Sequence, residues 1–346
     1  MTDIADALRV APYDGDAAAW DGFGQRQAGW TAFHRYAWRE VLRRSHGLET
    51  PFLAARDASG ALRGILPLVR QRSRIFGHFL VSMPFVNYGG PLGDDAAIRA
   101  LAEYADTMAQ RDGAGLLELR SARELPLDFP VSHRKITVVL ALDGGPDAVF
   151  GRFKAKLRSQ VRRPAKDGVT VRMGADQVDA FYAVFAEHMR DLGTPAQPLG
   201  FFREIAERLG DDAWFAVAWH EGKPIAAGAG LRWDAEFEIT WASALRAYNR
   251  LSPNMAVYWA LIERAAADGL TRFNFGRCTP GSATHKFKLQ WGAVDEALWW
   301  YSGRSSRVAG TPSPDSAKFR LAVRVWQRLP VALTRVVGPR IVRNIP

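Results

Sequence analysis

The chain has 346 residues, 48% of them hydrophobic and 24% charged, which excludes a disordered protein and favours two domains over one. It contains no apolar run of the roughly 18 residues that cross a bilayer, no signal-peptide pattern and a single cysteine, Cys278, so we expect a cytoplasmic protein without internal disulfides. The net charge of +10 is concentrated in residues 152–172 and 304–346, whereas the remainder is net negative. Such local basic patches indicate anionic partners, namely phosphate groups, lipid headgroups or nucleic acid.

The first half of the chain predicts a mixed α/β unit. The expected elements are a helix at 34–46, strands at 51–56, 61–69 and 78–85, a helix at 94–111 and a strand at 115–120. Asp57-Ala-Ser-Gly60 separates the first two strands and is typical of a hairpin turn. The third strand leads into Asn87-Tyr-Gly-Gly-Pro91, where two glycines allow the backbone to approach another group closely.

The second half predicts the same order of elements. Its expected elements are helices at 146–166, 176–190 and 200–209, strands at 214–219, 225–233 and 236–242, a helix at 254–267 and a strand at 271–275. In both halves a hairpin, a strand, a helix and an Asp-Gly turn lead to a short strand, which ends near Arg120 in one half and near Arg277 in the other. We interpret this order as a duplication of one α/β unit, with domains at 1–145 and 146–303 and a linker with a basic helical tail at 304–346.

The densest cluster of polar residues lies between Phe273 and Gly292. A strand is expected to end at Phe275, and a loop of Gly, Pro, Ser and Thr then opens a helix near Ser282. Ligands favour the carboxyl ends of strands in α/β sheets, and N–H groups at helix starts attract anions or a developing oxyanion. The candidate cationic residues of this segment are Arg277, His285, Lys286 and Lys288. The alternative is a capped helix whose lysines are only solvated.

Three segments of the second half resemble the carboxyl-terminal signature of FemAB-like proteins: Asn254-Met-Ala-Val-Tyr-Trp-Ala-Leu-Ile-Glu263, Phe275-Gly-Arg277 and Phe287-Lys-Leu-Gln-Trp-Gly292. His34-Arg-Tyr-Ala-Trp38 and Leu80-Val-Ser-Met-Pro-Phe-Val-Asn-Tyr-Gly-Gly90 resemble the matching amino-terminal segments, so the resemblance covers residues 30–302. The branch that the chain resembles most is the group associated with exosortase/PEP-CTERM and exopolysaccharide gene sets. The resemblance implies two tandem GNAT-like acyltransferase domains of mixed α/β fold. It also implies transfer of an acyl or aminoacyl group to an amine in peptidoglycan or exopolysaccharide biosynthesis.

The resemblance further implies roles for single residues. Lys288 matches the lysine of the Phe-Lys-x-x-x-Gly pattern and is expected to stabilise a tetrahedral oxyanion. Arg277 matches the arginine of the Phe-Gly-Arg pattern and is expected to position the acceptor or its phosphate. Five further residues are candidates for lining the substrate groove: Asn87, Tyr88, Trp241, Asn254 and Tyr258. The alternative for them is packing in the core. Aminoacyl-tRNA or an acyl-CoA is the expected co-substrate, with no tightly bound cofactor and no metal.

Two features near Arg277 bear on other chemistries. The segment from Arg277 to Ala283 is one residue too long for the acetyl-CoA loop of simple GNAT enzymes, which disfavours plain acetyl-CoA chemistry. Cys278 stands where the family pattern has serine. A nucleophilic Cys278 with His285 as its base is a minor alternative to a small buried side chain.

The basic stretch 152–172 is the second candidate site. Lys154, Arg158 and Arg162 are spaced by four and share a helix face, with Lys156 beside it. The resemblance implies that Lys156 and Arg158 face a phosphate-bearing substrate or a tRNA end, whose geometry arginine suits. The alternative is a solvated helix face between domains.

The tail at 316–343 predicts a basic amphipathic helix that is interrupted at Pro330. One stripe consists of Arg320, Arg324 and Arg328, and the other of Phe319, Ala322, Val323, Trp326 and Leu329. Such a helix either lies on an anionic membrane surface, here the inner face, or packs on the protein's own domains. The sequence leaves both alternatives open.

Three other functions stay open at this point. An acyl-CoA-dependent N-acyltransferase acting on a sugar or sugar nucleotide would share this fold. A non-catalytic assembly factor at the membrane would depend on the tail rather than on Lys288. A nucleic-acid-binding protein is less well supported and DNA is not an expected partner, because no recognition motif accompanies the basic patches.

Overall fold

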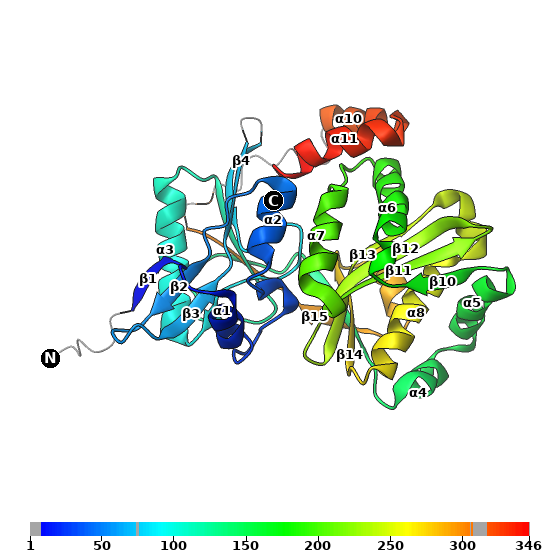
Figure 1. The fold of residues 1–346 in the computed structure, drawn as a ribbon, viewed down its shortest axis with the longest axis horizontal. Helices are drawn as coiled ribbons and strands as arrows, with labels where there is room; N and C mark the ends of the chain where they lie inside the picture. Colours follow the sequence, from blue (N-terminus) through cyan, green and yellow to red (C-terminus); the bar gives the residue numbers. More distant parts are fainter. Residues whose placement is uncertain (1–7, 74–75, 305, 307–316, 346) are drawn as a thin grey trace. The chain divides into compact units, whose positions relative to one another are not determined.

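The computed structural model describes residues 8–73, 76–304, 306 and 317–345, which form two compact α/β units (Figure 1). Within the described residues, the first unit comprises residues 8–134, 297–306 and 343–345. The second unit comprises residues 135–296 and 317–342. The expected mixed α/β class with two tandem units and a helical tail is therefore observed.

The first unit contains two sheets, with strand orders β1-β2-β3-β6 and β4-β5-β7-β16-β8. Its elements are β1 (Arg9–Pro12), α1 (Ala17–Gly24), η2 (Ala32–His34), α2 (Trp38–His46), β2 (Leu53–Arg56), β3 (Leu62–Leu66), β4 (Val69–Ser73), β5 (Gly77–Val81), β6 (Leu92–Gly93), α3 (Asp95–Arg111), β7 (Leu116–Ser121), β8 (Val131–Ser132) and β16 (Trp299–Ser302). The predicted hairpin turn joins β2 and β3, and Asp57 stabilises it by accepting the N–H groups of Ser59 and Ala61. α3 begins at the N-cap Asp94 and buries Ile98, Leu101 and Ala105 in the core of this unit.

The second unit is built on one seven-stranded sheet, with strand order β10-β11-β12-β13-β14-β9-β15. Its elements are β9 (Ile136–Ala141), α4 (Gly145–Arg152), α5 (Ala155–Lys166), β10 (Thr170–Met173), η3 (Ala175–Gln177), α6 (Val178–Leu192), α7 (Leu199–Leu209), η4 (Gly210–Asp212), β11 (Ala213–His220), β12 (Lys223–Trp233), β13 (Glu236–Ala244), η5 (Arg246–Leu251), α8 (Pro253–Ala267), β14 (Arg272–Cys278), α9 (Ala283–Leu289), β15 (Val294–Ala297), α10 (Ala317–Arg328) and α11 (Val331–Val342). Successive residues of β11 point to opposite faces of the sheet: Trp214 packs in the core with α8, whereas Phe215 contacts Phe181 of α6. Helices therefore cover both faces.

The structure divides the chain differently from the predicted boundaries at 145/146 and 303/304. β9 precedes the predicted boundary, but it pairs with β14 and so belongs to the second unit. β16 follows the second unit in sequence, but it pairs with β7 of the first. Pairing between strands that are far apart in sequence, rather than a change in composition, sets these boundaries.

The predicted single helix at 146–166 is two helices, α4 and α5. Phe153 and Lys154 between them have extended backbone, with ψ angles of 142° and 149°. The break allows the Phe153 ring to pack edge-to-face against Trp259 and Trp291 in the core. Burial of this ring explains why a continuous helix is not formed.

The two units repeat one arrangement, as the sequence predicted. In the first unit, β5 and β7 pair in parallel through residues 79–81 and 116–118, and α3 connects them. In the second unit, β13 and β14 pair in parallel through residues 236–238 and 272–274, and α8 connects them. The order of elements confirms the duplication.

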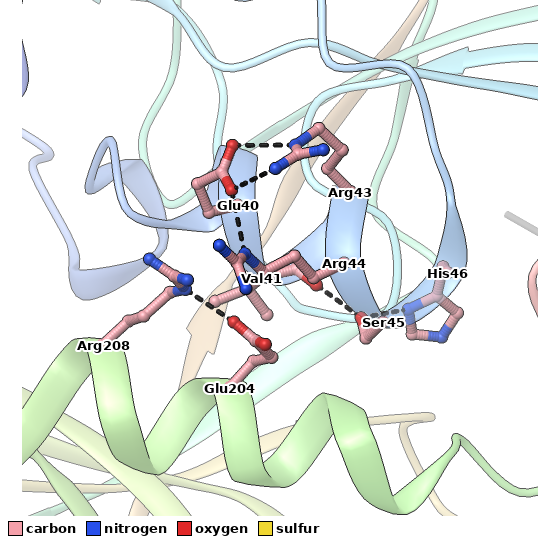
Figure 2. Close-up of polar contacts among 8 residues, drawn as sticks. All are labelled: Glu40, Val41, Arg43, Arg44, Ser45, His46, Glu204 and Arg208. Carbon is pink, nitrogen blue, oxygen red and sulfur yellow. Dashed lines mark hydrogen bonds and ion pairs between the residues drawn. The ribbon is translucent and has the colours of Figure 1, made fainter.

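Ion pairs on helix surfaces contribute little to the stability of either unit. In α2, Glu40 accepts hydrogen bonds from Arg43 and Arg44 (Figure 2). In α7, Arg208 pairs with Glu204 at 2.6 Å. Exposed pairs at this spacing, such as Glu40 with Arg44, are each worth only about 0.3–0.5 kcal/mol, so the buried apolar cores hold the fold.

The tail helices α10 and α11 pack against α6 of the second unit. Arg190 donates to the Leu329 carbonyl at 3.1 Å, and Gln327 donates to the Asp191 carbonyl at 3.0 Å. One face of the tail thus docks on the protein, which is one of the two predicted alternatives. In the described part of the chain, no helix is both long and apolar enough to cross a bilayer.

Candidate active site

The sheet of the second unit opens where β13 and β14 part. Their parallel pairing covers only three residues on each strand and ends at Glu238 and Asn274. Beyond that point β13 carries a bulge at Thr240, and β14 carries a register shift between Asn274 and Arg277 where it pairs with β9. Bulges of this kind re-aim side chains next to functional sites.

In the first unit, the position that corresponds to this opening lies between β5 and β7 and is filled by the loop that follows β5. Arg120, near the end of β7, is 3% exposed and donates to the carbonyls of Met83 and Val86 in the loop after β5. The Arg120 backbone is bonded to the same loop, since its N–H donates to Ser82 Oγ and its carbonyl accepts from Gly90. The loop therefore occupies the position next to β7, and the second unit is the better candidate for a working site.

Lys288 places a buried cation at the opening in the second unit. It lies on α9, is 3% exposed, and its Nζ donates to the carbonyls of Gly276 at 2.5 Å and Arg277 at 3.0 Å. These bonds use two of its three N–H groups and leave one for a ligand. Burial lowers the pKa of Lys288 to about 8, while the nearby Cys278 and Glu238 raise it. Lys288 is thus a poorly solvated cation at neutral pH.

Asn274 shapes the backbone that Lys288 binds. Its Oδ1 accepts the Gly276 N–H at 2.8 Å and the Thr137 hydroxyl, and its Nδ2 donates to Glu236 at 2.8 Å. Gly276 has a φ of +68°, a conformation that glycine adopts without strain. The sequence analysis did not single out Asn274. The available signal was an amide in an otherwise apolar strand, Phe273-Asn-Phe275.

Part of the anion site predicted at the start of α9 is already engaged by hydrogen bonds within the chain. α9 has seven residues, and its N-cap Ser282 accepts the His285 N–H. The Gly281 N–H donates to His285 Nδ1 at 2.9 Å, and His285 Nε2 contacts Asp295 at 2.8 Å. The N–H groups of Gly281 and His285 thus already have acceptors. With Nδ1 as the acceptor, His285 carries its proton on Nε2 and ties the loop to β15.

Cys278 does not have the environment of a nucleophile. Its side chain is buried at the end of β14, and burial raises the pKa of its thiol. Both His285 nitrogens are engaged elsewhere, which removes the base considered for it. Among the described residues, no three His, Cys, Asp or Glu side chains gather to hold a metal ion.

Further cations surround the end of β14. Arg277 and Lys286 are exposed, and Lys135 donates to Thr279 Oγ1 at 2.7 Å. Burial and the neighbouring Arg277 lower the pKa of Lys135. The sequence analysis missed Lys135, although it directly precedes the apolar run that forms β9.

The predicted groove residues fall into different places. Tyr258 of α8 is buried beside Phe275, and burial raises the pKa of its hydroxyl. Asn254 is half-buried at the start of the same helix. Trp241 packs edge-to-face against rings of α7, which is the core-packing alternative. Asn87 and Tyr88 are buried within the first unit. The structure therefore brings Tyr258 close to Phe275 of β14 and assigns Trp241 to packing.

The basic helix α5 forms a pocket of about 260 Å³ with positively charged walls. The pocket is lined by Ala155, Arg158, Ser159, Arg162 and Lys166. Arg158 is fixed by donating to the carbonyls of Gly151 and Phe153, and the Arg162 guanidinium stacks over the Phe150 ring at 4.9 Å. Lys156 is exposed and does not line this pocket.

The comparisons with known proteins agree with the observed fold. Residues 151–288 match the family model described as an acetyltransferase (GNAT) domain, a segment that runs from α4 to Lys288. The solved structure named FemX has a TM-score of 0.63 at 13% identity, covering 84% of this chain and 96% of that one. A tandem GNAT protein from the clavulanic acid biosynthesis pathway has a TM-score of 0.53 at 12% identity, covering 86% and 99%.

The chain has the tandem GNAT-like fold. In sequence, 136 residues are 25% identical to UDP-N-acetylmuramoylpentapeptide-lysine N(6)-alanyltransferase of Weissella viridescens. That match covers 37% of this chain and 40% of the relative, so it spans well under half of the curated protein. The expected resemblance to Fem-type proteins is thus supported at the level of the GNAT domain and of the whole fold.

Proposed function

We propose that this GNAT-like protein transfers an acyl or aminoacyl group to an amine on a cell-envelope precursor, and that its second unit is the working unit. The observation that carries the proposal is the buried Lys288 ammonium, held at the opening between β13 and β14 with one N–H left for a ligand. The similarity to an alanyltransferase of a muramoylpentapeptide precursor supports aminoacyl transfer in peptidoglycan synthesis. The resemblance to the exosortase-associated branch favours a more specific form of this proposal, in which the acceptor amine belongs to an exopolysaccharide precursor.

In this proposal the acceptor amine attacks the carbonyl carbon of the donor directly. The new C–N bond forms while the carbonyl π electrons move to oxygen, and the resulting oxyanion accepts a hydrogen bond from Lys288. A donor of this kind, in a site shielded from water, lowers the barrier by several kcal/mol, roughly 3–4 for one oxyanion donor. The intermediate then collapses by breaking the bond to the leaving group, which is a tRNA hydroxyl or a CoA thiol. The amine nitrogen loses one proton and the leaving oxygen or sulfur gains one; this transfer runs directly or through solvent, because Lys288 is already protonated at neutral pH.

The cationic pocket on α5 suits the phosphate groups of such a substrate. Arg158, Arg162 and Lys166 converge there without an acidic residue in the lining. Arginine binds phosphate through paired N–H donors, and Arg158 is already oriented by its two backbone bonds. We assign aminoacyl-tRNA as the donor. An acyl-CoA is the second candidate, because the matching family model is that of an acetyltransferase domain. The reaction would take place in the cytoplasm.

Turnover by Lys288 variants tests this function. Purified protein is incubated with charged tRNA or acyl-CoAs and with amine-bearing UDP-linked muramoylpeptides or aminosugars, and transfer of a labelled acyl group is measured. Lys288→Met is expected to lower kcat by about 10²–10³-fold, the usual loss for one oxyanion donor. Lys223→Met, at an exposed position at the start of β12, serves as the matched control and keeps wild-type kcat. Equal turnover by Lys288→Met and wild type, or transfer from neither donor class, would sink the proposal in favour of a non-catalytic role.

A further inference from the structure

The tail helices use only one side for packing. Val323 of α10 lies so close to Gly193 that a methyl group there would be 2.4 Å from Val323 Cγ1. Trp326 is half-buried and approaches Gly338 of α11, where a methyl group would lie 3.6 Å from its ring. Thr334 of α11 is buried as well. Val323 and Trp326, two residues of the predicted apolar stripe, therefore belong to the docking face.

The opposite side of α10 exposes large apolar side chains. Leu321 is 62% exposed and Val325 is 53% exposed. Arg324 and Arg328 are also exposed and follow at the spacing i, i+3, i+4, i+7 that defines one helix face. This face therefore alternates aliphatic side chains with arginines.

α11 repeats this arrangement. Leu333 is 45% exposed and Val336 is 58% exposed, and exposed Arg340 completes the same spacing. The sequence from 317 to 345 contains seven basic residues and no Asp or Glu. An outward face that combines aliphatic side chains with arginines and lacks acidic residues is complementary to a surface that is both apolar and negatively charged.

We infer that the outward faces of α10 and α11 bind an anionic lipid bilayer surface. The arginines would contact phosphate headgroups, and Leu321, Val325, Leu333 and Val336 would enter the boundary of the acyl chains. Nucleic acid fits less well, because its backbone offers charge but no apolar layer for these side chains. The inference is independent of the acyl-transfer reaction and goes beyond it, since it concerns where the protein lies rather than what it transfers.

Sedimentation with lipid vesicles tests this surface on the full chain. Wild-type protein is expected to bind vesicles of phosphatidylcholine with about one-third phosphatidylglycerol at least ten-fold more tightly than vesicles of phosphatidylcholine alone. Arg324→Gln/Arg328→Gln is expected to weaken binding about 25-fold, since each arginine near the surface contributes roughly five-fold. Leu321→Ser/Val325→Ser is expected to weaken it at least about ten-fold.

Matched variants on the first unit separate this surface from general charge and apolarity. Arg9→Gln/Arg26→Gln removes the same charge from exposed positions, and Val131→Ser removes an aliphatic side chain that is 42% exposed. Both are expected to bind vesicles like wild type. All variants change exposed side chains, and circular dichroism with thermal unfolding checks that each is folded.

Three results would overturn the inference. One is equal binding of wild type to charged and neutral vesicles. Another is undiminished binding by the α10 variants, which would place the lipid contact elsewhere, for instance on α5. The third is no vesicle binding together with a concentration-dependent dimer that Leu321→Ser/Val325→Ser dissociates, which would make the occupant a second copy of the chain.

Discussion

Lys288 and Asn274 bind the same residue of β14: Lys288 Nζ donates to the Gly276 carbonyl at 2.5 Å, and Asn274 Oδ1 accepts the Gly276 N–H at 2.8 Å. The ammonium is therefore positioned by the β14 backbone, whose local shape depends in turn on one buried amide. A cation that is fixed before substrate binds costs no reorganisation when charge develops on the substrate. Substitutions at Lys288 and in β14 can therefore separate the effect of the charge from that of the backbone that holds it.

Transfer activity is expected to fall as pH rises through about 8, the pKa to which burial lowers Lys288. Above that pH the side chain loses the positive charge that stabilises the oxyanion, whereas below it the charge is fully present. kcat is measured from pH 6 to pH 10 for wild type and for Lys288→Arg. The arginine stays charged over this range, so the decline near pH 8 should disappear in that variant. A decline of the same midpoint in Lys288→Arg would assign the titration to another group.

Stability should show the opposite trend with pH. The pKa of Lys288 lies below its unfolded value of 10.5, so folding at lower pH forces a charged group into a buried site. Below pH 8 the buried charge destabilises the folded state by its full amount, about 3 kcal/mol for a pKa shift of this size. Between about 8 and 10.5 the unfolded chain binds the extra proton, and this contribution makes stability rise with pH. The free energy of unfolding in urea is measured for wild type and Lys288→Met at pH 7 and pH 10, and the change in their difference gives the contribution of Lys288. A difference between the two proteins that does not change with pH would contradict the burial argument.

Asn274→Leu is expected to destabilise the second unit by about 2–4 kcal/mol, because the buried Gly276 N–H loses its acceptor and the Glu236 carboxylate loses one of its donors. Thr137→Val removes only the bond between the Thr137 hydroxyl and Asn274 and is expected to cost about 1 kcal/mol. Urea unfolding measures both free energies. If the two variants were equally stable, Asn274 would not be the residue that fixes the β14 backbone at Gly276.

Gly276→Ala and Gly281→Ala distinguish backbone strain from placement of Lys288. Both glycines have positive φ, +68° and +76°, so each alanine should cost about 1–2 kcal/mol. Only Gly276 contributes a carbonyl to the Lys288 ammonium. Gly276→Ala should therefore lower kcat at least ten-fold, while Gly281→Ala should keep kcat within about two-fold of wild type. Similar kcat values for both variants would show that the position of this carbonyl does not matter.

The α5 pocket predicts a change in substrate affinity. Arg162→Gln/Lys166→Gln removes two exposed cations from its wall and is expected to raise KM for a phosphate-bearing substrate ten-fold or more, with little change in kcat. Arg163→Gln is the control, since this residue lies on the same helix but pairs with Asp167 at 3.3 Å. The measurement is steady-state kinetics at low and high salt. A KM that rises equally in the control would make the effect one of general charge.

The sequence predicted those features that depend on local pattern. The hairpin at Asp57 and the helices α3 and α8 follow from apolar periodicity and turn residues within short windows. The role proposed for Lys288 came from a family pattern, and its burial could not have been read from the lysine itself. β9 and β16 were missed because each is completed only by pairing with a strand far away in sequence.

Arg120 and Arg277 show the same limit at a single repeated position. Both lie near the end of the last strand of the repeat, yet Arg120 is buried and Arg277 is exposed. The difference arises from the loop after β5, in which Met83 and Phe85 adopt positive φ, a rare conformation for such residues. A repeat in sequence does not reveal the conformation of this loop.

We expect Arg120 to hold the loop after β5 against β7 in the first unit. Arg120→Met is expected to cost about 3–5 kcal/mol, because Glu118 would lose its buried partner and the carbonyls of Met83 and Val86 their donor. The variant also loses the stacking of the guanidinium over Trp300, 4.5 Å from the ring centre. Arg111→Gln, at a position whose side chain is 71% exposed, should change stability by less than about 0.5 kcal/mol. Urea unfolding compares the two, and limited proteolysis should show faster cleavage at residues 82–90 only in Arg120→Met. Wild-type stability and proteolysis in that variant would mean that something other than Arg120 keeps the loop against β7, and the contrast between the two units would then need another cause.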